Sequence, residues 1–372
     1  MHTDTKIQNK VIPHNKPTIG EEEIKAVVDT LSNLELTVGA KVEEFERAFA
    51  KYIGTNAVAT SSGTSALHLA LIAIDVSKND EVIIPSYTCI AVAFPVLYQQ
   101  AKPILADVKD DYNISVEDIK RKITDKTKAI IVPHMFGYPA DLDEIKEICE
   151  EADIYLIEDC AQSIGATYND KKVGTFGDIS IFSFNATKMM TTIQGGMVCT
   201  NNLDWIQIFK DLRYHDQLRS FEDVDLRLKY SYRMSDVGAA MGIVQLKKLD
   251  YFINRRREIA SIYRKKLNDD KIIHPCESSE KRHVYFRYVI KTPYPSRAII
   301  EKMREHNIIC EVMHMPPLSR RALLKEFNRD AEFPKTEEII NFTVSLPIYP
   351  SLKDEEAIYI ADIFNKTMKG MK

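Results

Sequence analysis

The feature that most constrains the fold is an alternation, from about residue 55 onward, of short apolar runs with longer amphipathic segments. The apolar runs are NAVAT, EVIIP, KPILADV, AIIVPHMFG, IYLIED and DISIFSF, and helix-like stretches such as SALHLALIAI and DLDEIKEICEEA separate them. Strands that are apolar on both faces and joined through helices are typical of a parallel sheet covered on both sides. The pattern therefore predicts an α/β fold with a mostly parallel sheet and helices on both faces.

Two flanking regions have a different texture. Upstream, TIGEEEIKAVVDTLSN and AKVEEFERAFAKYIG have helical spacing; after Gly196, GMVCT predicts another strand, followed by helices around 235–248 and 250–268. The strand-like VYFRYVI and helix-like SRAIIEKMREHN then indicate a smaller α+β unit. We predict a large domain over residues 1–250, which includes the N-terminal helical segment, and a small C-terminal domain over residues 251–372.

Composition excludes several classes of protein. The chain has 372 residues, 45% hydrophobic and 28% charged, so a disordered or fibrous protein is excluded, and a net charge of −4 predicts no general attraction to nucleic acid or anionic membranes. The N-terminus lacks the apolar stretch of a signal peptide, and no later run has the length of a membrane span. Six cysteines without a C-x-x-C pair fit reduced thiols. We expect a cytoplasmic protein without disulfides or a metal site.

A possible anion site follows the first strand, in SSGTSALHLAL. We expect the strand to end near Thr60 and a helix to start near Ser65, with Gly63 allowing close approach of the backbone. Amides and hydroxyls of Thr64 and Ser65 at a helix N-terminus would suit a phosphate. The same residue pattern also caps ordinary helices, and capping alone stays open as the alternative.

Two charged residues follow later strands. Asp159 ends the apolar run IYLIED, where an unpaired carboxylate is costly, so we expect a cationic partner, and Gln162 could face the same space. Lys188 follows DISIFSF within a few residues, together with Ser183, and a partly buried lysine has the lowered pKa of a nucleophile toward carbonyls. A structural salt bridge for Asp159 and a surface position for Lys188 are the alternatives.

The combination is more informative than its members. Carboxyl ends of parallel strands meet at one sheet edge, where ligands bind. An anion site, a carboxylate and an amine at that edge are the three contacts that pyridoxal 5′-phosphate requires, for its phosphate, its pyridine nitrogen and its aldehyde. We therefore predict pyridoxal 5′-phosphate as cofactor.

The chain also resembles the DegT/StrS family of fold-type I, aspartate-aminotransferase-like enzymes, which are mostly sugar aminotransferases. The motifs that carry the resemblance are SSGTSALHLAL, PSYTCIAVA, HMFGYPADLDEI, IEDCAQSIGA, FSFNATK, YSYRMSDVGAAMGIVQL and LPIYP, in the family's order over nearly the whole chain. It implies that the cofactor forms a Schiff base with Lys188, that Asp159 pairs with the pyridine nitrogen, and that Gln162 lies against the ring.

The same resemblance implies the remaining contacts. The phosphate would be bound by Gly63, Thr64 and Ser183. The family forms homodimers with shared active sites, and Ser231, in the loop YSYRM, would contact the phosphate in the neighbour's site. Cys89 stands where an aromatic residue often stacks on the ring, so that contact is thinner here or comes from Tyr87. Candidates for contacts with substrate are Tyr87, Arg233 and His314, although Arg233 also fits a structural ion pair.

The function that the resemblance implies is transamination from an amino acid, by analogy L-glutamate, to a nucleotide-linked keto-sugar, giving an amino sugar by a ping-pong reaction. A cyclitol or other polyhydroxy ketone is an alternative acceptor, and a non-catalytic regulator with this fold is a second alternative. Lys188 argues against the dehydratases of the family, which carry histidine at that place. A nucleotide-dependent dehydrogenase would need G-x-G-x-x-G after the first strand, and this pattern is missing.

Overall fold

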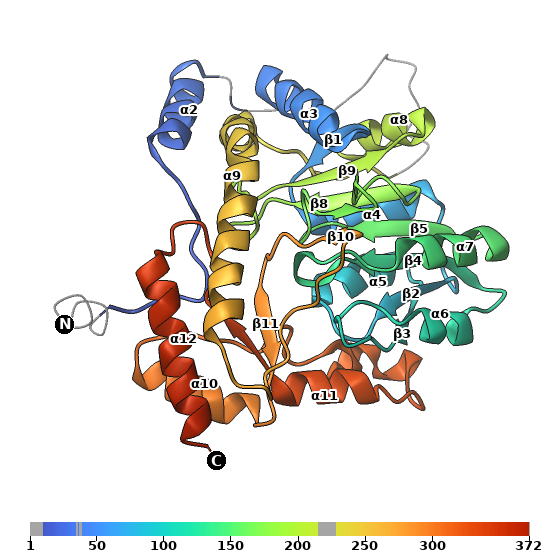
Figure 1. The fold of residues 1–372 in the computed structure, drawn as a ribbon. Coiled ribbons are helices and arrows are strands. Elements are labelled where there is room, and N and C mark those ends of the chain that lie inside the picture. Colours follow the sequence, from blue (N-terminus) through green and yellow to red (C-terminus); the bar gives the residue numbers. More distant parts are fainter. Residues whose placement is uncertain (1–9, 35, 37–38, 215–227, 372) are drawn as a thin grey trace, which may run out of the picture.

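A seven-stranded sheet forms the centre of the protein (Figure 1). The computed structural model describes residues 10–34, 36, 39–214 and 228–371. The strand order is β1-β9-β8-β5-β4-β2-β3. The strands are β1 (Asn56–Thr60), β2 (Glu81–Pro85), β3 (Lys102–Ala106), β4 (Thr127–Pro133), β5 (Tyr155–Asp159), β8 (Ile179–Ser183) and β9 (Gly196–Thr200). Each coincides with a run that is predicted as a strand from the sequence, although β4 begins two residues before its run.

The direction of the strands confirms the expected α/β class. Neighbours from β3 through β2, β4 and β5 to β8 pair in parallel, and only β9 within this sheet runs antiparallel, to both β8 and β1. The parallel strands therefore end at one edge, where β5 and β8 lie side by side with Asp159 opposite Ile181. This edge holds the candidate site.

Helices cover both faces of the sheet. One face packs against α4 (Gly63–Ala73), α5 (Ala93–Tyr98) and α8 (Leu203–Leu212). The other packs against α3 (Ala40–Ile53), α6 (Val116–Lys122), α7 (Leu142–Ala152) and the first half of α9 (Asp236–Lys266). Helix α2 (Glu21–Ser32) lies against α9, and short 3-10 turns η1 (Ile90–Val92) and η2 (Met135–Gly137) follow β2 and β4. The burial of apolar residues on both sides explains why the strand sequences lack alternation.

Helix α9 corrects one expectation. The two helices expected around 235–248 and 250–268 are one helix of 31 residues, Asp236–Lys266. The sequence between them, KKLDYF, contains no glycine or proline that would end a helix. In Figure 1, α9 stands between the sheet and the C-terminal helices.

The C-terminal part has its own apolar core. It combines the second half of α9 with a two-stranded antiparallel sheet. The elements of the C-terminal part that follow α9 and β10 (Lys281–Arg282) are β11 (Tyr288–Lys291), α10 (Ser296–Glu305), η3 (Leu318–Arg320), η4 (Ala322–Phe327), α11 (Pro334–Phe342), β12 (Thr343–Leu346) and α12 (Asp354–Lys369). Ile12 also packs into this core and pairs with Ile308, so residues near the N-terminus join the C-terminal part. Because α9 crosses residue 250 without a break, a domain boundary there stays a prediction.

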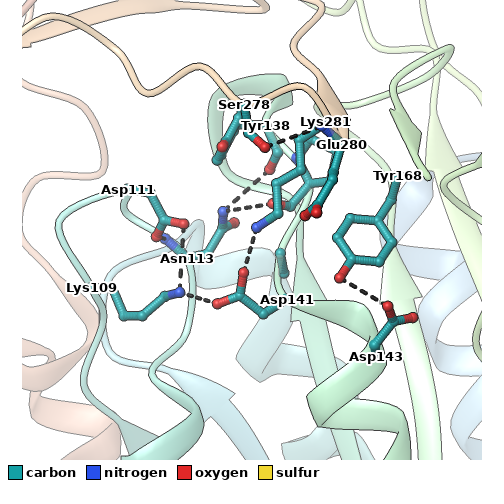
Figure 2. A network of polar contacts seen from close by, with 12 residues as sticks. Lys109, Asp111, Asn113, Tyr138, Asp141, Asp143, Tyr168, Ser278, Glu280 and Lys281 are labelled. Carbon is teal, nitrogen blue, oxygen red and sulfur yellow. Dashed lines mark hydrogen bonds and ion pairs between the residues drawn. The ribbon is translucent and has the colours of Figure 1, made fainter. Parts of the chain in front are cut away.

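A polar network joins residues 281–282 to the segments that follow β3 and β4 (Figure 2). Strand β10 (Lys281–Arg282) pairs with β6 (Thr167–Tyr168), which pairs with β7 (Lys171–Lys172). Lys109 and Lys281 both form ion pairs with Asp141. We call Lys109, Asp141 and Lys281 the Asp141 junction. Its buried lysine, Lys281, has a carboxylate partner.

Among the residues described, none of the helices combines the length and apolar character that a membrane span requires.

Candidate active site

A cavity of about 330 Å³ opens at the carboxyl ends of β5 and β8. The residues of the sequence prediction that line it are Gly63, Thr64, Cys89, Asp159, Gln162, Ser183 and Lys188. The structure thus brings together the anion-binding turn, the carboxylate and the amine from four separate segments of the chain. This convergence follows from the parallel sheet, in which successive strands end at the same edge.

Lys188 lies in a tight loop between the antiparallel strands β8 and β9. Asn185 organises the loop: its Oδ1 accepts hydrogen bonds from the amide and the hydroxyl of Thr187, both at 3.2 Å, and its carbonyl accepts one from the amide of Lys188. Thr191 continues the pattern by donating its hydroxyl to the carbonyl of Phe184. Small polar residues therefore surround Lys188 because they satisfy the backbone of this loop.

Among the described residues, the Nζ of Lys188 forms no ion pair and no hydrogen bond. It lies over the ring of Phe286, 5.2 Å from the centroid. Burial lowers the pKa of Lys188, the negative charge of Asp159 opposes this shift, and the positive charge of Arg287 adds to it. A lysine held this way supplies a neutral amine more readily than a solvated lysine does.

Asp159 is equally short of partners. Its side chain is 8% exposed, and one carboxylate oxygen accepts a hydrogen bond of 2.9 Å from the amide of Ala161. Burial raises the pKa of Asp159, while this hydrogen bond and the charge of Lys188 work in the opposite direction. Among the described residues, the charge of Lys188 lies near Asp159 as expected for a cationic partner, but the two form no ion pair. A positively charged ring nitrogen would supply what the carboxylate lacks.

The N-terminus of α4 supplies the anion site and corrects the expected start of this helix. Ser62 is the N-cap and α4 begins at Gly63, two residues before Ser65. The reason is a reciprocal capping box: the amide of Ser65 donates to the hydroxyl of Ser62, and the amide of Ser62 donates to the hydroxyl of Ser65. Capping and anion binding are compatible, because the amides of the first turn otherwise lack partners.

Glycines allow this turn to approach the sheet closely. A Cβ atom on Gly63 would lie 2.9 Å from the Cβ of Ser183, and one on Gly196 would lie 2.3 Å from the carbonyl oxygen of Ser62. Gly196 therefore lets β9 pass against the start of α4. In the described part of the chain, the hydroxyls of Thr64 and Ser183 have no hydrogen-bond partner, so both are available to a ligand.

The other predicted residues differ in whether they line the cavity. Gln162 lines the cavity, and its amide oxygen accepts a hydrogen bond of 3.1 Å from the amide of Phe136. Cys89 is exposed in the cavity, whereas Tyr87 is completely buried and donates its hydroxyl to the carbonyl of Met313. Ser65 is buried within the capping box and does not line the cavity. Of these residues, Cys89 and Gln162 are placed to meet a ligand without rearrangement.

The candidates in the YSYRM loop lie beside the end of β1. The carbonyl of Tyr232 accepts a hydrogen bond of 2.8 Å from the amide of Ser61, and Ser231 is exposed next to it. The guanidinium of Arg233 lies over the ring of Tyr214, 4.1 Å from its centroid. Neither Ser231 nor Arg233 lines the cavity of this subunit. Their roles across a dimer interface stay predictions.

His314 lies among aromatic rings near Lys188. It stacks on Phe136 and meets Tyr87 edge to face. Its Nε2 is buried without a hydrogen-bond partner in the described structure. Burial lowers the pKa of His314 to about 3, and the charges of Lys188 and Arg287 contribute. His314 is therefore neutral at physiological pH.

Three residues near Lys188 carry no recognisable signal in the sequence. Phe286 and Arg287 belong to VYFRYVI, which looks like an ordinary strand, and Asn15 lies far away in the chain. In the structure Phe286 lies under Lys188, Arg287 contributes charge to it, and Asn15 donates a hydrogen bond of 3.1 Å to the carbonyl of Thr187. These contacts depend on how the C-terminal part meets the sheet, which no local pattern predicts.

The residues present fit pyridoxal 5′-phosphate. The hydroxyls of Thr64, in the first turn of α4, and of Ser183, at the end of β8, have no partner among the described residues and suit its phosphate. A buried carboxylate with one hydrogen bond suits a protonated ring nitrogen, and an unpaired amine suits its aldehyde. By contrast, the described cluster of His134, Glu158 and Cys160, which could in principle hold a metal ion, is already bonded internally, because Glu158 accepts hydrogen bonds from three backbone amides.

Comparisons with known proteins agree with this geometry. The sequence profile of the DegT/DnrJ/EryC1/StrS aminotransferase family matches residues 17–365. The chain is 36% identical to the GDP-perosamine synthase of Escherichia coli O157:H7, over 96% of this chain and 98% of that protein.

Solved structures are similar over the same length. PseC of Helicobacter pylori, an aminotransferase involved in the biosynthesis of pseudoaminic acid, superposes with a TM-score of 0.92 at 26% identity, covering 97% of this chain and all of the other. The PLP-form of Spr1654 from Streptococcus pneumoniae has a TM-score of 0.92 at 27% identity, covering 98% of this chain and 100% of the other. These likenesses confirm the predicted fold.

Proposed function

Because the chain belongs to the DegT/DnrJ/EryC1/StrS aminotransferase family, we propose that it transfers an amino group from an amino acid to a nucleotide-linked keto-sugar with pyridoxal 5′-phosphate. Relatives named for sugar transamination support this acceptor class; they include GDP-perosamine synthases and a dTDP-4-dehydro-2,3,6-trideoxy-D-glucose 4-aminotransferase. One observation carries the proposal: Lys188 and Asp159 line the same cavity. Among the described residues, the amine of Lys188 has no ion-pair partner and the carboxylate of Asp159 accepts one hydrogen bond.

Cofactor binding would use the three groups that the cavity brings together. The amides and hydroxyls at Gly63, Thr64 and Ser183 would hold the phosphate, and Asp159 would keep the pyridine nitrogen protonated. Lys188 would attach the aldehyde covalently through a Schiff base. When bound, the cofactor supplies an electrophilic carbon for an amine and a ring that delocalises electrons.

Lys188 would have a second role as the acid and base of the reaction. The amino group of the donor, proposed to be L-glutamate, would replace Lys188 on the cofactor. The freed Nζ could then take the proton from the donor's α-carbon and return it to the cofactor carbon that Lys188 had held. Burial favours the neutral amine that this step needs. Phe286 limits the space beside Nζ and helps to exclude water from it.

The test begins with the protein loaded with pyridoxal 5′-phosphate, which should be yellow. L-glutamate alone should remove the colour, and one member of a panel of GDP-, dTDP- and UDP-linked keto-sugars should restore it. Borohydride reduction followed by peptide mapping should label Lys188. Colourless protein after loading, or a label at another residue, would contradict the proposal. A panel in which only cyclitol ketones restore the colour would replace the proposed acceptor class.

We also propose a homodimer in which Ser231 and Arg233 reach the active site of the partner subunit, because both residues lie outside the cavity of their own subunit. The test mixes two inactive variants, Lys188→Ala and Arg233→Ala, and allows subunits to exchange. If Arg233 acts across the interface, mixed dimers contain one intact site and activity returns to about a quarter of the wild-type level at equal mixing. If it acts within its own subunit, every site in a mixed dimer lacks either Lys188 or Arg233, so activity stays absent.

A further inference from the structure

Residues 12–18 run from the C-terminal core toward α2, and we call them the N-terminal strap; Figure 1 shows them as part of the blue segment that leads to α2. The strap is anchored at Ile12, which is 1% exposed and pairs in parallel with the segment after α10. His14, which is 5% exposed, is a second anchor. One of its ring nitrogens lies 2.8 Å from the hydroxyl of Ser345, and the other lies 3.2 Å from the carboxylate of Glu311. The beginning of the strap is therefore fixed on the C-terminal part.

The second half of the strap contacts the loop that carries Lys188. The Nδ2 of Asn15 donates a hydrogen bond of 3.1 Å to the carbonyl of Thr187, the residue directly before the lysine. The carbonyl of Thr18 accepts a hydrogen bond of 2.9 Å from the side chain of Gln245 on α9. The strap therefore meets the loop directly at one point and meets a side chain of α9 at another.

Gln245 joins the strap to the far side of the same loop. Its amide oxygen accepts a hydrogen bond of 3.2 Å from the amide of Thr191, and its amide nitrogen donates to Thr18 and to the carboxylate of Glu23. Gln245 is 1% exposed, so water does not compete for these bonds. The strap thus holds the loop before Lys188 through one side chain of its own, and after Lys188 through one buried side chain of α9.

The internal hydrogen bonds of the loop shape it but do not fix where it lies. They join residues of the segment 184–195 to one another. In the described structure, side-chain hydrogen bonds from other parts of the chain reach this segment only from Asn15 and Gln245. The two methionines that follow Lys188 are buried in the core and restrain the loop on that side. On the other side Thr187 is exposed, so its position depends more strongly on Asn15.

We propose that Asn15 is a positioning residue that holds Lys188 in place through the carbonyl of Thr187. This inference rests on the proposed function. An amine that attaches a cofactor and then transfers protons has to return to one position, and a misplacement of about 1 Å costs about 10²-fold in rate. Asn15 does not line the cavity, so it acts on the rate without contacting a ligand.

The first experiment follows the donor half-reaction of the loaded enzyme with L-glutamate by the loss of colour. Asn15→Ala removes the donor group, and Asn15→Asp keeps its shape but offers only acceptors at neutral pH. We expect both variants to lower the limiting rate at least about fivefold and to leave the half-saturating concentration of L-glutamate within about twofold, because the cavity lining is unchanged. A wild-type rate in either variant overturns the proposal, and so does an effect confined to the half-saturating concentration.

Asn365→Ala is the matched control. The Nδ2 of Asn365 donates a hydrogen bond of 2.8 Å to the carbonyl of Lys266, at the end of α9. Asn15 and Asn365 each have a buried Oδ1 without a hydrogen-bond partner among the described residues. The two alanine substitutions therefore remove the same groups, and we expect their Tm values to agree within about 2 °C while only Asn15→Ala reacts slowly. Either an equal loss of rate in Asn365→Ala or a much lower Tm in Asn15→Ala alone overturns the proposal.

The second experiment measures hydrogen exchange in the cofactor-free protein, in peptides that cover residues 184–195. If Asn15 holds the loop, amides of this segment should exchange at least about threefold faster in Asn15→Ala than in the wild type, and Asn365→Ala should leave them unchanged. A slower half-reaction of Asn15→Ala with unchanged exchange would show that Asn15 does not act through Thr187, and overturns the proposal.

Hydrogen exchange also separates this inference from the proposed function, because it needs neither cofactor nor substrate. If exchange in the loop depends on Asn15 but the wild type transfers no amino group to any sugar, the acceptor assignment fails and the hold of Asn15 on the loop stands. If sugars are aminated but Asn15→Ala exchanges and reacts as the wild type does, the function stands and the positioning role fails.

Discussion

Two adjacent carboxylates on β5 have opposite surroundings. Glu158 is completely buried and accepts hydrogen bonds of 2.7 Å from the amides of Gly174, Phe176 and Gly177. The carboxylate of the next residue, Asp159, accepts one hydrogen bond in the described structure, from the amide of Ala161. Successive side chains of a strand point to opposite faces, so two neighbours in sequence belong to different regions.

The pKa values follow this difference. For Glu158 burial acts to raise the pKa, but the hydrogen bond with His134 and those from the backbone outweigh it, and the pKa is lowered. For Asp159 burial prevails and the pKa is raised. The same contrast separates two lysines. Lys281 pairs with Asp141 (Figure 2), whereas Lys188 has no such partner among the described residues. Charged groups with ion-pair or hydrogen-bond partners stabilise the fold, whereas charged groups with few such partners lie where a ligand is expected.

The largest expected effect tests the two lysines. Lys188→Ala should abolish turnover, because the covalent attachment and the proton transfer both depend on its amine. Lys281→Ala should retain turnover and lose about 1–3 kcal/mol of the free energy of unfolding, because Asp141 keeps only one of its two cations. Steady-state kinetics and urea denaturation measure the two quantities. A Lys188→Ala enzyme that turns over would remove the basis of the comparison.

The next largest effect tests Asp159 in catalysis. Asp159→Asn should reduce kcat/KM by about 10²–10⁴-fold, because a neutral amide does not keep a ring nitrogen protonated. The loaded variant should also release the cofactor more readily, which dialysis followed by absorbance measures. A fully active Asp159→Asn variant would show that the small number of hydrogen-bond partners around Asp159 has no role in the reaction.

Stability should change in opposite directions at the two carboxylates. Glu158→Gln should lose about 3 kcal/mol, because its amide group cannot accept all the hydrogen bonds that the carboxylate accepts. In cofactor-free protein, Asp159→Asn should gain about 1 kcal/mol, because it removes a buried charge with one partner. Urea denaturation at pH 7 gives both values. Changes of the same sign would show that the contrast lies only in geometry.

The pH dependence of these differences has a defined sign. The folded-state pKa of Glu158 is lowered, so its contribution is present above the unfolded pKa and is lost as pH falls through the folded pKa. The folded-state pKa of Asp159 is raised, so folding is favoured below the unfolded pKa and that advantage is lost as pH rises through the folded pKa. Both variants should therefore approach wild-type stability in acid, and denaturation curves at several pH values measure this.

The last expected effect concerns the backbone below the cavity. Gly196→Ala should cost about 1–3 kcal/mol and weaken cofactor binding, because its methyl group would meet the carbonyl of Ser62 and displace the start of α4. Gly370→Ala is the control, since its Cβ would make only ordinary contacts, at 3.6 Å and beyond. Thermal denaturation and cofactor titration measure the effects. Equal behaviour of the two variants would mean that the close approach at Gly196 relaxes freely.

Local patterns predicted the sheet and the residues at its edge. Asp159 and Lys188 could be found because each follows an apolar strand, and parallel strands end together. The start of α4 was misplaced because Ser62 and Ser65 both fit a cap, and only the reciprocal bonds decide between them. The contact of Phe286 with Lys188 could not be found, because it depends on how the C-terminal part meets the sheet.

The unbroken course of α9 has a consequence for anyone who divides this protein into fragments. Its first half packs Ala239 and Ile243 against the sheet, and its second half packs Ile259 and Tyr263 into the C-terminal core. A cut at residue 250 would leave each fragment with half a helix and an uncovered apolar stripe. Split reporters and separately expressed halves should therefore keep residues 236–266 together on one piece.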